Sequence, residues 1–590
     1  MANALLWFSQ PFLLTLVVNQ RINDQISVTR QRGIFCARLK EVATMLLRRG
    51  KMAVALSVLA GGMLSVACAT PQAAPPPAGG GSNEVKAGGI LRFSYHTDPV
   101  YLDPIRKNVS DMEMITGGTY GMLLRYKLGK EQGYTSTVLQ SYLAEKWEVS
   151  PDGGTYTFNL RKGVMNENKA PLNGSEFTSK DVKFNLERYR DDRQSTAKYM
   201  VEEIKSIETP DPYTVKVIMN GPFAPFLTYA GNTELLMVPQ ALVEAGLSEK
   251  QAIGYGPYRF ESGKEGSVFK MKKNPDFFLK DEKGRSLPYL DGYDMYIIPD
   301  EAAQVAAFVA GQVDICARCL PGSSPLLDTL KQGAKDATIV ELLDAGGDKI
   351  YISQQWEPGK DIRVRQAIQA AINPKAFIDA LSKGKAQLNI AGIGPAWGDW
   401  SLPAAEIGKY YAADPAKARQ LLKDAGRENL PVEIMWTPAS GQGFRLWGEM
   451  LVSQLKAAGF DPKLDTVENA VAFDRKRKAE FHLHIFGGSF RPDPDGNIYA
   501  TFKCGSSLNY SKACDPQLDP LLEKQRSITD VTERKKAVHD ALRMINERAI
   551  GFLQPYSDHT AYYWRPYVKG YYPHMYWGFG LKTLETWLDK

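Results

Sequence analysis

The sequence predicts a mixed α/β fold, and three observations support this class. Residues 146–160 alternate apolar and polar side chains on both sides of a Pro-Asp-Gly-Gly turn, which is typical of a strand hairpin. Residues 178–190 begin with a capping pattern and then place apolar residues at helical spacing. After about residue 340, strand and helix patterns alternate along the chain. Such alternation indicates an α/β fold, and 590 residues suffice for two or more domains.

Residues 1–67 have the composition of a leader for export. They contain eight Lys and Arg against two acidic residues, whereas the rest of the chain holds 64 of each sign. Arg48, Arg49 and Lys51 precede an apolar run, 52–64, that is too short for a stable membrane anchor. Because the rest of the chain is electrically balanced, it lacks the basic footprint of a nucleic-acid-binding protein. We therefore expect no nucleic-acid partner.

The run SVAC that ends at Cys68 resembles a lipobox, in which this cysteine is acylated and becomes the mature N-terminus. Its first residue is Ser where Leu is usual, and a short buried helix with a free cysteine is the alternative interpretation. Met45 stands at the natural start of the signal, so residues 1–44 either precede the true start, which we favour, or extend the leader. Residues 68–88 are rich in Pro, Gly and Ala, as in a flexible tether.

The folded part is expected to begin near residue 89, and its elements follow from local patterns. Asp361 and Asp414 each stand where a helix cap is needed, and a Pro follows the second of them. The expected elements are a strand at 213–219, a helix at 301–310, a strand at 350–353, helices after Asp361 and Asp414, a helix through Leu446, Met450, Leu451 and Leu455, a strand at 481–486, and a long helix near 529–546.

Several stretches match specific residue patterns beyond the periodicity that a helix or strand requires. They read LAEKWEVSPDGGTYTFNLRKGV, TSKDVKFNLER, GYGPYRF, KMKKNPDFF, DIRVRQAIQAAINPKAFIDAL and DPAKARQLLKDAG. Together they resemble the bacterial extracellular solute-binding proteins of family 5, which hand peptides, nickel complexes or oligosaccharides to ABC importers. The resemblance covers roughly residues 89–571, and it implies a first strand at 89–95 and a turn with its return strand within 254–278. It implies a two-lobed fold of the periplasmic-binding-protein kind (type II, the large family 5 variety) with two hinge strands and a central ligand cleft.

The resemblance also implies a division of the chain and a mechanism. Lobe I would comprise 89–340 plus 556–590, and lobe II would comprise 341–555. Crossing strands near 348–355 and 552–563 would form the hinge, and a ligand would shift the balance between open and closed shapes. The closed shape would be recognised by the importer. A surface lipoprotein that uses the same lobes as a peptide chaperone, sensor or adhesin is the alternative.

The partners that follow from this interpretation are a small solute, either an oligopeptide or an oligosaccharide, and the permease subunits of an ABC importer. The membrane would be a third partner through the lipid anchor, and we expect the protein to be a monomer in the periplasm or at the cell surface. No GxSxG, HExxH, P-loop or GxGxxG motif stands in a suitable context. We therefore expect no enzyme activity and no cofactor.

The cysteines and histidines offer two further candidate sites. Family members often have a disulfide where Cys504 and Cys514 flank a short loop, so the resemblance implies this bond. Cys316 and Cys319 form a CxxC, for which a structural disulfide is favoured over a redox pair or half of a zinc site, because no second CxxC is present. His482 and His484 would lie on the same side of a strand, as two histidine ligands of one metal ion do. With no third ligand at suitable spacing, we expect no metal.

By resemblance, loops that face the cleft carry the expected ligand contacts. Flat aromatic side chains suit stacking on sugar rings or covering the side chains of a peptide, although each of them also suits an ordinary core or surface position. The predicted ligand-binding residues are Tyr95, His96, Tyr101, Tyr120, Trp356, Trp397, Phe490, Arg491 and Asp493.

The loop GGSFRPDPDGN bears on the kind of ligand. Peptide-binding family members place an Asp there that pairs with the α-ammonium group of the peptide, and the matching position in this sequence is Phe490, beside Arg491. Asp493 or Asp495 could substitute if the loop shifts. Because a buried ammonium without a counter-charge costs several kcal/mol, we expect free di- and tripeptides to bind weakly or not at all. A neutral or anionic ligand, such as an oligosaccharide, or a longer peptide held by its backbone, is favoured.

Overall fold

The computed structural model describes residues 84–590, except 100, 107–112, 317–319, 439–441, 489–490 and 576–578. The leader, Cys68 and most of the tether lie outside the described residues, as do Phe490 and Cys319. The architecture below is that of the compact unit Asn83–Lys590. Within the described residues, no helix has both the length and the apolar character that crossing a membrane requires.

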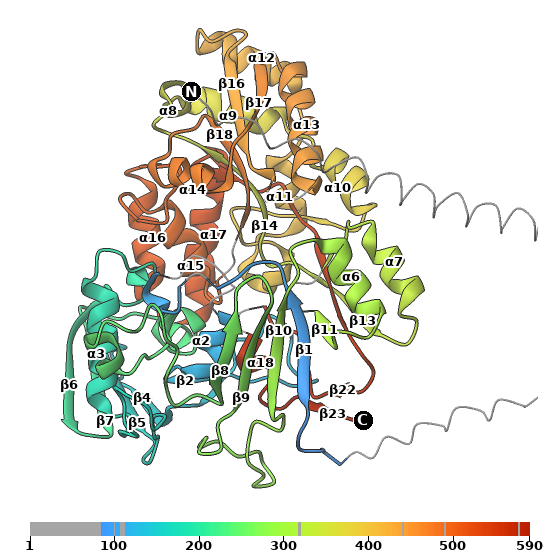
Figure 1. Ribbon diagram of the computed structural model, residues 1–590. Coiled ribbons are helices and arrows are strands. Elements are labelled where there is room, and N and C mark those ends of the chain that lie inside the picture. The colour runs from blue at the N-terminus through green and yellow to red at the C-terminus, as the bar shows by residue number, and fades with distance from the viewer. Residues whose placement is uncertain are drawn as a thin grey trace, which may run out of the picture. The chain divides into compact units, whose positions relative to one another are not determined.

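An eight-stranded sheet draws its strands from both ends of this unit (Figure 1). Its strands are β1 (Ile90–Tyr95), β8 (Tyr258–Lys264), β9 (Val268–Lys273), β10 (Gly292–Ile297), β11 (Ile315–Cys316), β12 (Leu320–Pro321), β13 (Thr338–Leu343) and β21 (His559–Trp564). Their order is β12-β21-β11-β1-β10-β9-β8, with β13 also paired to β21. The first strand is parallel to both of its neighbours, β10 and β11.

A separate five-stranded sheet is the second largest sheet among the described residues. It contains β14 (Gly347–Ile352), β16 (Pro431–Trp436), β17 (Asp461–Thr466), β18 (Leu483–Gly488) and β19 (Phe552–Leu553), in the order β17-β16-β18-β14-β19. Ile350 and Ile352 belong to the apolar core on one face of this sheet. Because side chains alternate between the faces of a strand, Lys349 and Tyr351 lie on the opposite face.

Smaller sheets complete the strand inventory of the described residues. A four-stranded sheet, β4-β5-β7-β6, contains β4 (Ala144–Val149), β5 (Thr155–Leu160), β6 (Ile204–Asp211) and β7 (Thr214–Met219). The two-stranded pairs are β2 (Leu124–Tyr126) with β3 (Leu139–Ser141), β15 (Gln387–Leu388) with β20 (Tyr556–Ser557), and β22 (Val568–Lys569) with β23 (Trp587–Leu588).

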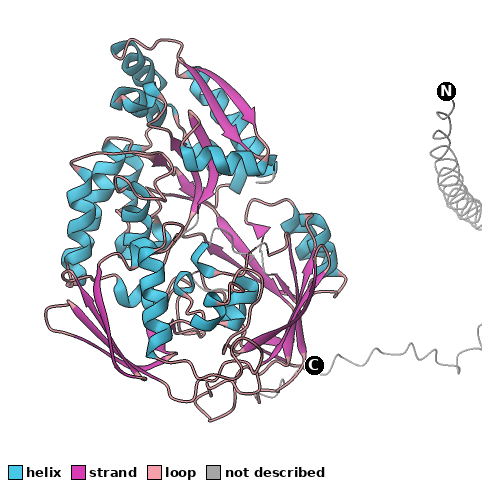
Figure 2. Cartoon of the chain, turned by 60° about the vertical axis from the view of Figure 1, so that its left-hand side comes forward, coloured by secondary structure: helices cyan, strands magenta, loops and turns pink. Residues whose placement is uncertain are grey.

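The helices lie between and beside these sheets (Figure 2). They are α2 (Glu113–Thr119), α3 (Ser179–Asp191), α4 (Phe226–Ala230), α5 (Gln240–Glu244), α6 (Glu301–Val309), α7 (Leu326–Gly333), α8 (Glu357–Lys360), α9 (Ile362–Ala371), α10 (Pro374–Ser382), α11 (Ala404–Tyr410), α12 (Pro415–Asp424), α13 (Gln442–Ala457), α14 (Asn469–Lys478), α15 (Pro494–Phe502), α16 (Leu518–Ser527), α17 (Val531–Glu547) and α18 (Phe579–Lys582). Short 3-10 turns occur at Pro104–Arg106, Lys198–Met200, Thr233–Leu235 and Pro395–Trp400.

Two connections join the eight-stranded and five-stranded sheets. The chain leaves β13 and enters β14 across residues 344–346, and it returns from β19 to β21 across residues 554–558, which include β20. These connections fall within or beside the ranges expected for the hinge. The division into lobes at residues 340 and 555 stays a prediction.

Most of the caps expected from the sequence are formed. The backbone N–H of Thr178 donates to Asp181 Oδ2 at 2.9 Å at the start of α3. Asp361 accepts from the N–H of Arg363 at the start of α9, and Asp414 accepts from Lys417 in α12. These bonds satisfy N–H groups that the first turn of a helix leaves without partners.

The expected apolar face of α13 was partly wrong. Leu446 is 46% exposed, whereas Trp447, Leu451 and Leu455 are buried in the core beside the five-stranded sheet. Residues 447, 451 and 455 have the same helical spacing as residues 446 and 450, so the pattern alone did not fix which stripe faces inward.

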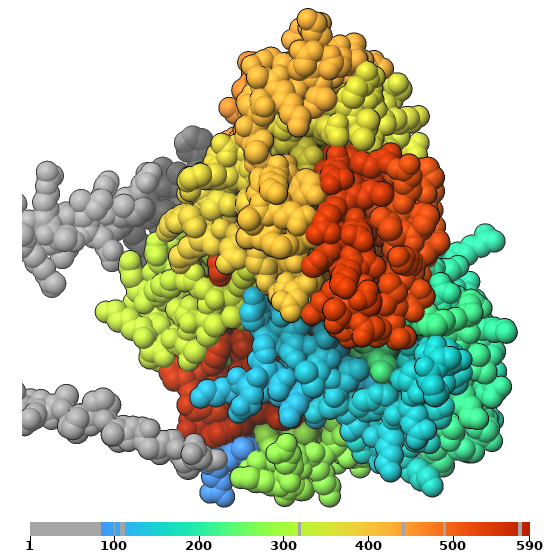
Figure 3. Space-filling model, turned by 180° about the vertical axis from the view of Figure 1, so that it is seen from behind, coloured from blue at the N-terminus to red at the C-terminus, as the bar shows by residue number. Residues whose placement is uncertain are grey.

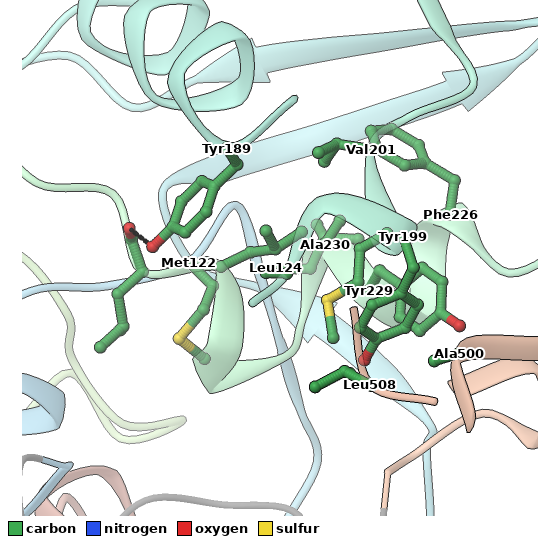
Figure 4. Packing of buried hydrophobic residues seen from close by; sticks show 14 of the residues in the cluster. Met122, Leu124, Tyr189, Tyr199, Val201, Phe226, Tyr229, Ala230, Ala500 and Leu508 are labelled. Carbon is green, nitrogen blue, oxygen red and sulfur yellow. Dashed lines mark hydrogen bonds between the residues drawn. The ribbon is translucent and has the colours of Figure 1, made fainter. Parts of the chain in front are cut away.

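The largest core cluster joins segments that are far apart in the sequence. Figure 4 shows Tyr199 and Tyr229 close to Ala500 and Leu508, and all four belong to this cluster. Seen from behind, the orange-red C-terminal segment lies against the cyan and teal N-terminal segments (Figure 3). Arg526 of α16 forms an ion pair with Glu202 at 2.7 Å across this contact.

Candidate functional site

The inner face of the five-stranded sheet, opposite the core that contains Ile350, carries a group of polar and aromatic side chains. In the antiparallel pairing of β14 with β18, Lys349 lies opposite Phe486 and Tyr351 lies opposite His484. Directly opposed residues share a face, so these four side chains form one continuous patch. Lys349 is 3% exposed, which is unusual for a lysine.

Lys476 of α14 reaches onto this patch. Its Nζ lies 3.5 Å from the ring centre of Phe486, 4.4 Å from that of Tyr510 and 5.3 Å from that of Tyr351. No carboxylate in the described part of the chain lies within ion-pair distance of this ammonium group. Burial lowers the pKa of Lys476 well below that of an ordinary lysine, and the charges of Lys349 and Arg491 lower it further.

Lys349 is in a similar environment. Its Nζ lies 4.4 Å from the ring centre of Phe552 on β19, and it too has no ion-pair partner among the described residues. Burial and the nearby charge of Arg491 lower the pKa of Lys349 to about 7, against the opposing effect of Asp344. Charged and neutral forms of this lysine therefore coexist near neutral pH.

Arg491 supplies the third positive charge. It is 9% exposed, and its guanidinium carbon lies 5.5 Å from the ring centre of Tyr199. Glu234 is its nearest carboxylate, at 3.7 Å from Nε. That separation is too long for a hydrogen bond, and Nε has no hydrogen-bond partner within the described residues. We refer to Lys349, Lys476 and Arg491 together as the cation cluster.

The two aspartates beside this cluster are occupied by internal partners. Asp493 accepts from Arg534 Nη1 at 2.9 Å and Nη2 at 2.5 Å, and it caps α15 by accepting from the N–H of Asp495. Asp495 accepts from the Tyr229 hydroxyl at 2.7 Å and from Gln525 Nε2 at 2.5 Å. Neither carboxylate is therefore available as a counter-charge for a ligand.

Of the ligand-binding residues expected from the sequence, Arg491 alone joins the cation cluster within the described part of the chain. Tyr95 is buried in β1 and its ring lies 4.6 Å from that of His96, while Tyr101 is 48% exposed. Tyr120 is fully buried in the largest core cluster. Asp493 is adjacent to the cluster but paired as described, and Phe490 lies outside the described residues.

The two expected tryptophans lie at different places. Trp397 is buried, and its Nε1–H donates to the carbonyl of Ala345 in the first connection between the sheets, at 3.1 Å. Trp356 stacks on His482 with ring centres 4.7 Å apart and packs against the outer core of the five-stranded sheet. Trp397 thus supports the connection between the sheets, and Trp356 packs against the core on the other face of the five-stranded sheet.

The histidine pair does not form a metal site in the described part of the chain, where no group of three or more potential metal-binding side chains occurs. His482 accepts from the N–H of Glu433, whereas Nδ1 of His484 is 3.1 Å from the carbonyl of Met435. Burial lowers the pKa of His484 to about 3, so its ring is neutral. The hydrogen bond assigns the proton to Nδ1 and leaves Nε2 as a buried acceptor without a partner among the described residues.

Cys504 and Cys514 form a disulfide that closes the loop between α15 and α16. Cys316 is also disulfide-bonded, but because Cys319 lies outside the described residues the pairing of the CxxC stays a prediction.

Replacing Cys504 and Cys514 with Ser is expected to lower the free energy of unfolding by about 2–3 kcal/mol, because a loop of this length would gain freedom in the unfolded chain. Urea unfolding followed by circular dichroism would measure the change. An unchanged midpoint and slope would contradict the expectation.

Sequence reasoning missed Lys349 and Lys476. A signal for the first was present, because Lys349 stands directly before the apolar run that ends at Ile352. Lys476 carried no such signal, since it lies in the run RKRK, which is typical of a solvated helix face. The structure separates the members of this run, with Lys476 5% exposed and the side chain of Lys478 55% exposed.

Comparison with known proteins places this site in context. Residues 138–509 match the bacterial extracellular solute-binding proteins, family 5. The chain is 28% identical over 506 residues to di/tripeptide-binding protein 1 of Pseudomonas aeruginosa, covering 80% of this chain and 89% of that protein.

Solved structures extend the likeness to the fold. The periplasmic binding protein DppA of Helicobacter pylori, in complex with the peptide STSA, is 25% identical with a TM-score of 0.74, covering 86% of this chain and 99% of that one. AgaA of A. tumefaciens R10, in complex with agropinic acid, is also 25% identical with a TM-score of 0.73, covering 85% and 99%. The predicted α/β fold of the two-lobed periplasmic-binding-protein kind is thereby confirmed.

The family resemblance read from the sequence is confirmed as well, because the match spans well over half of the chain. Members of this family bind solutes for ABC importers and are not enzymes. The chain belongs to the bacterial extracellular solute-binding proteins of family 5.

Proposed function

We propose that this protein is the receptor of an ABC importer, which captures one small solute against the inner face of the five-stranded sheet and delivers it to the permease. The observation that carries the proposal is the structural similarity to two binding proteins, one solved with a peptide and one with agropinic acid. The similarity covers 99% of the length of each of these proteins. A peptide-like or sugar-like solute suits the rings of Tyr351, Phe486 and Tyr510.

The importer role predicts a specific loss of uptake. Solute released by denaturing the protein purified from its native host would be identified by mass spectrometry and added back to the solute-free protein. We expect one solute bound per chain, and loss of uptake of this compound in cells that lack the gene. Unchanged uptake would contradict the importer role and leave a sensor or chaperone role.

We further propose that Cys68 carries the lipid that holds the receptor at the membrane surface, as a monomer, through the tether 68–88. Replacing Cys68 with Ser is expected to release the protein from membranes into the soluble fraction, because a tether without its acyl chains has no apolar group to insert. Fractionation and mass spectrometry of the mature N-terminus would measure this. A mature chain that begins elsewhere or lacks the lipid would contradict the expectation.

The proposed ligand differs from the di- and tripeptides named for the curated relative. The carboxylates of Asp493 and Asp495 have internal partners, so neither can pair with the α-ammonium of a free peptide. We expect dialanine and trialanine to produce no shift in the melting temperature. A ligand at 100 times its Kd adds about 2.7 kcal/mol to the free energy of unfolding, so a large shift with either peptide would contradict this.

A further inference from the structure

We infer that the cation cluster is a subsite for the carboxylate group of an anionic solute. This inference deepens the proposed function and rests on it. Lys349 comes from β14, Lys476 from α14 and Arg491 from the segment that precedes α15. Three elements that are distant in the sequence thus bring their positive charges to one inner face.

The charge balance of this face is positive. Glu234 lies 3.7 Å from Arg491, and Asp344 influences Lys349 without approaching to ion-pair distance. Within the described residues, Lys476 is influenced by two positive charges and by no carboxylate. The aromatic rings around the two ammonium groups offset part of the cost of burial, because the face of a ring attracts a cation. They do not neutralise the charge, whereas an anionic ligand would.

Buried polar atoms in the same region also need partners. Arg491 Nε, His484 Nε2 and Gln554 Oε1 are buried without a hydrogen-bond partner in the described residues. A Cβ atom added to Gly392 would lie 3.7 Å from Gln554 Oε1 and 3.9 Å from Lys349 Nζ, so these two groups face the same glycine. Buried polar groups in native proteins are nearly always paired. Arg491 Nε is a donor that the carboxylate of a solute would satisfy, whereas the two acceptors, His484 Nε2 and Gln554 Oε1, need O–H or N–H groups elsewhere on the same solute.

The alternative orientation, with an ammonium group of the solute in this position, is unfavourable. The ammonium would face the guanidinium of Arg491 and two lysine side chains, none of which supplies a negative counter-charge. Asp493 and Asp495 are already paired with Arg534, Tyr229 and Gln525. A carboxylate, in contrast, accepts charge-assisted hydrogen bonds from Lys and Arg. The carboxylate can be that of a peptide C-terminus or of a sugar acid, since both present the same group.

Matched variants on one helix test the assignment. Lys476→Met removes the buried ammonium group and keeps a long, unbranched side chain. Lys478→Met is the control, because it removes an exposed ammonium group whose ion-pair partner is Asp474. Lys349→Met is the second test variant, on a different element. Since each test variant removes a buried charge that has no counter-charge, we expect it to stay folded.

The probes are citrate, N-acetyl-dialanine and gluconate, with N-acetyl-dialanine amide and glucose as neutral counterparts, at constant ionic strength. We expect at least one carboxylate to raise the melting temperature saturably in the wild-type protein and in Lys478→Met. In Lys476→Met and Lys349→Met its affinity should fall about ten- to hundredfold. The response to N-acetyl-dialanine relative to gluconate distinguishes a peptide terminus from a sugar acid.

Two results would overturn the inference. One is the absence of a saturable shift with every carboxylate, and the other is a shift of equal size in wild type and in both test variants. If glucose or N-acetyl-dialanine amide binds with the same affinity to wild type and to both lysine variants, the carboxylate subsite is refuted, while the solute-binding function stands. Failure of the proposed function is recognised separately, by unchanged solute uptake in cells that lack the gene.

Discussion

Replacing Arg534 with Met is expected to lower the free energy of unfolding by about 3–5 kcal/mol, the cost of leaving one member of a buried ion pair without its partner. Asp493 and Arg534 make two hydrogen bonds, and the side chain of each is 6% exposed. Without Arg534, the carboxylate of Asp493 would remain buried with its counter-charge removed. The same change would also remove two hydrogen bonds that Arg534 donates to Gln525 Oε1, whose Nε2 group donates to Asp495.

Urea unfolding followed by circular dichroism would measure this loss. Lys536→Met is the control on the same helix, because the side chain of Lys536 is 66% exposed, and it should change stability little. The double variant Asp493→Asn with Arg534→Met should recover part of the loss, since it removes the unpaired charge as well. A stability of Arg534→Met equal to that of the control would show that this pair does not hold α15 against α17.

The affinity for a carboxylate ligand is expected to fall by up to about fiftyfold as the pH rises from 7 to 9, the limit set by the deprotonation of a group with a pKa of about 7. The pKa of Lys349 is lowered to about 7 in the free protein, and an anion bound beside it would raise that pKa. Between the pKa of Lys349 in the free protein and its higher pKa in the complex, ligand binding takes up a proton. The affinity therefore falls by up to about tenfold for each unit by which the pH rises. Lys476, whose pKa is also lowered, acts in the same direction.

The other titratable groups of this region change little in charge between pH 7 and 9. Burial raises the pKa of Asp344, which influences Lys349, to about 6, so this carboxyl is already largely ionised at pH 7 and its charge changes little up to pH 9. Tyr351 stays neutral because burial raises its pKa, and His484, with a pKa of about 3, does not titrate in this range. The two lysines therefore account for the expected change in affinity between pH 7 and 9.

Stability of the ligand-free protein should have the opposite pH dependence for Lys349. Its folded-state pKa is below the unfolded value, so the cost of burying the charged form is present below about pH 7 and disappears as the pH rises toward the ordinary lysine pKa.

The predicted change in ligand affinity is measured by calorimetric titration. Titrations in buffers of different ionisation enthalpy would count the protons taken up with the ligand. A constant affinity between pH 7 and 9, without proton uptake, would contradict the expectation.

The sequence predicted those parts of the fold that depend on short-range signals. The hairpin of β4 and β5, the cap at Thr178 and the caps at Asp361 and Asp414 each lie within a few residues of the groups that they satisfy. The face of α13 was less certain, because residues 446 and 447 begin two stripes of equal spacing. Tertiary contact with the five-stranded sheet, rather than the helix pattern, places Trp447 inward.

The site could be predicted only in part, for the same physical reason. Arg491 was found because it lies in a loop with a recognisable family pattern. Lys476 lies between Arg475 and Arg477, and only the packing of α14 against Phe486 and Tyr510 distinguishes its side chain from theirs. Likewise, the unavailability of Asp493 depends on Arg534, which is 41 residues away in the sequence.

A crystal structure of the protein with the solute that it carries from its native host would test the central claim most directly. The account predicts a carboxylate of that solute within hydrogen-bond distance of Lys476 Nζ and of Arg491 or Lys349, with the rest of the solute against the rings of Tyr351, Phe486 or Tyr510. A solute that presents a neutral or ammonium group to the cation cluster, or that binds elsewhere and leaves these three side chains without contact, would contradict the account.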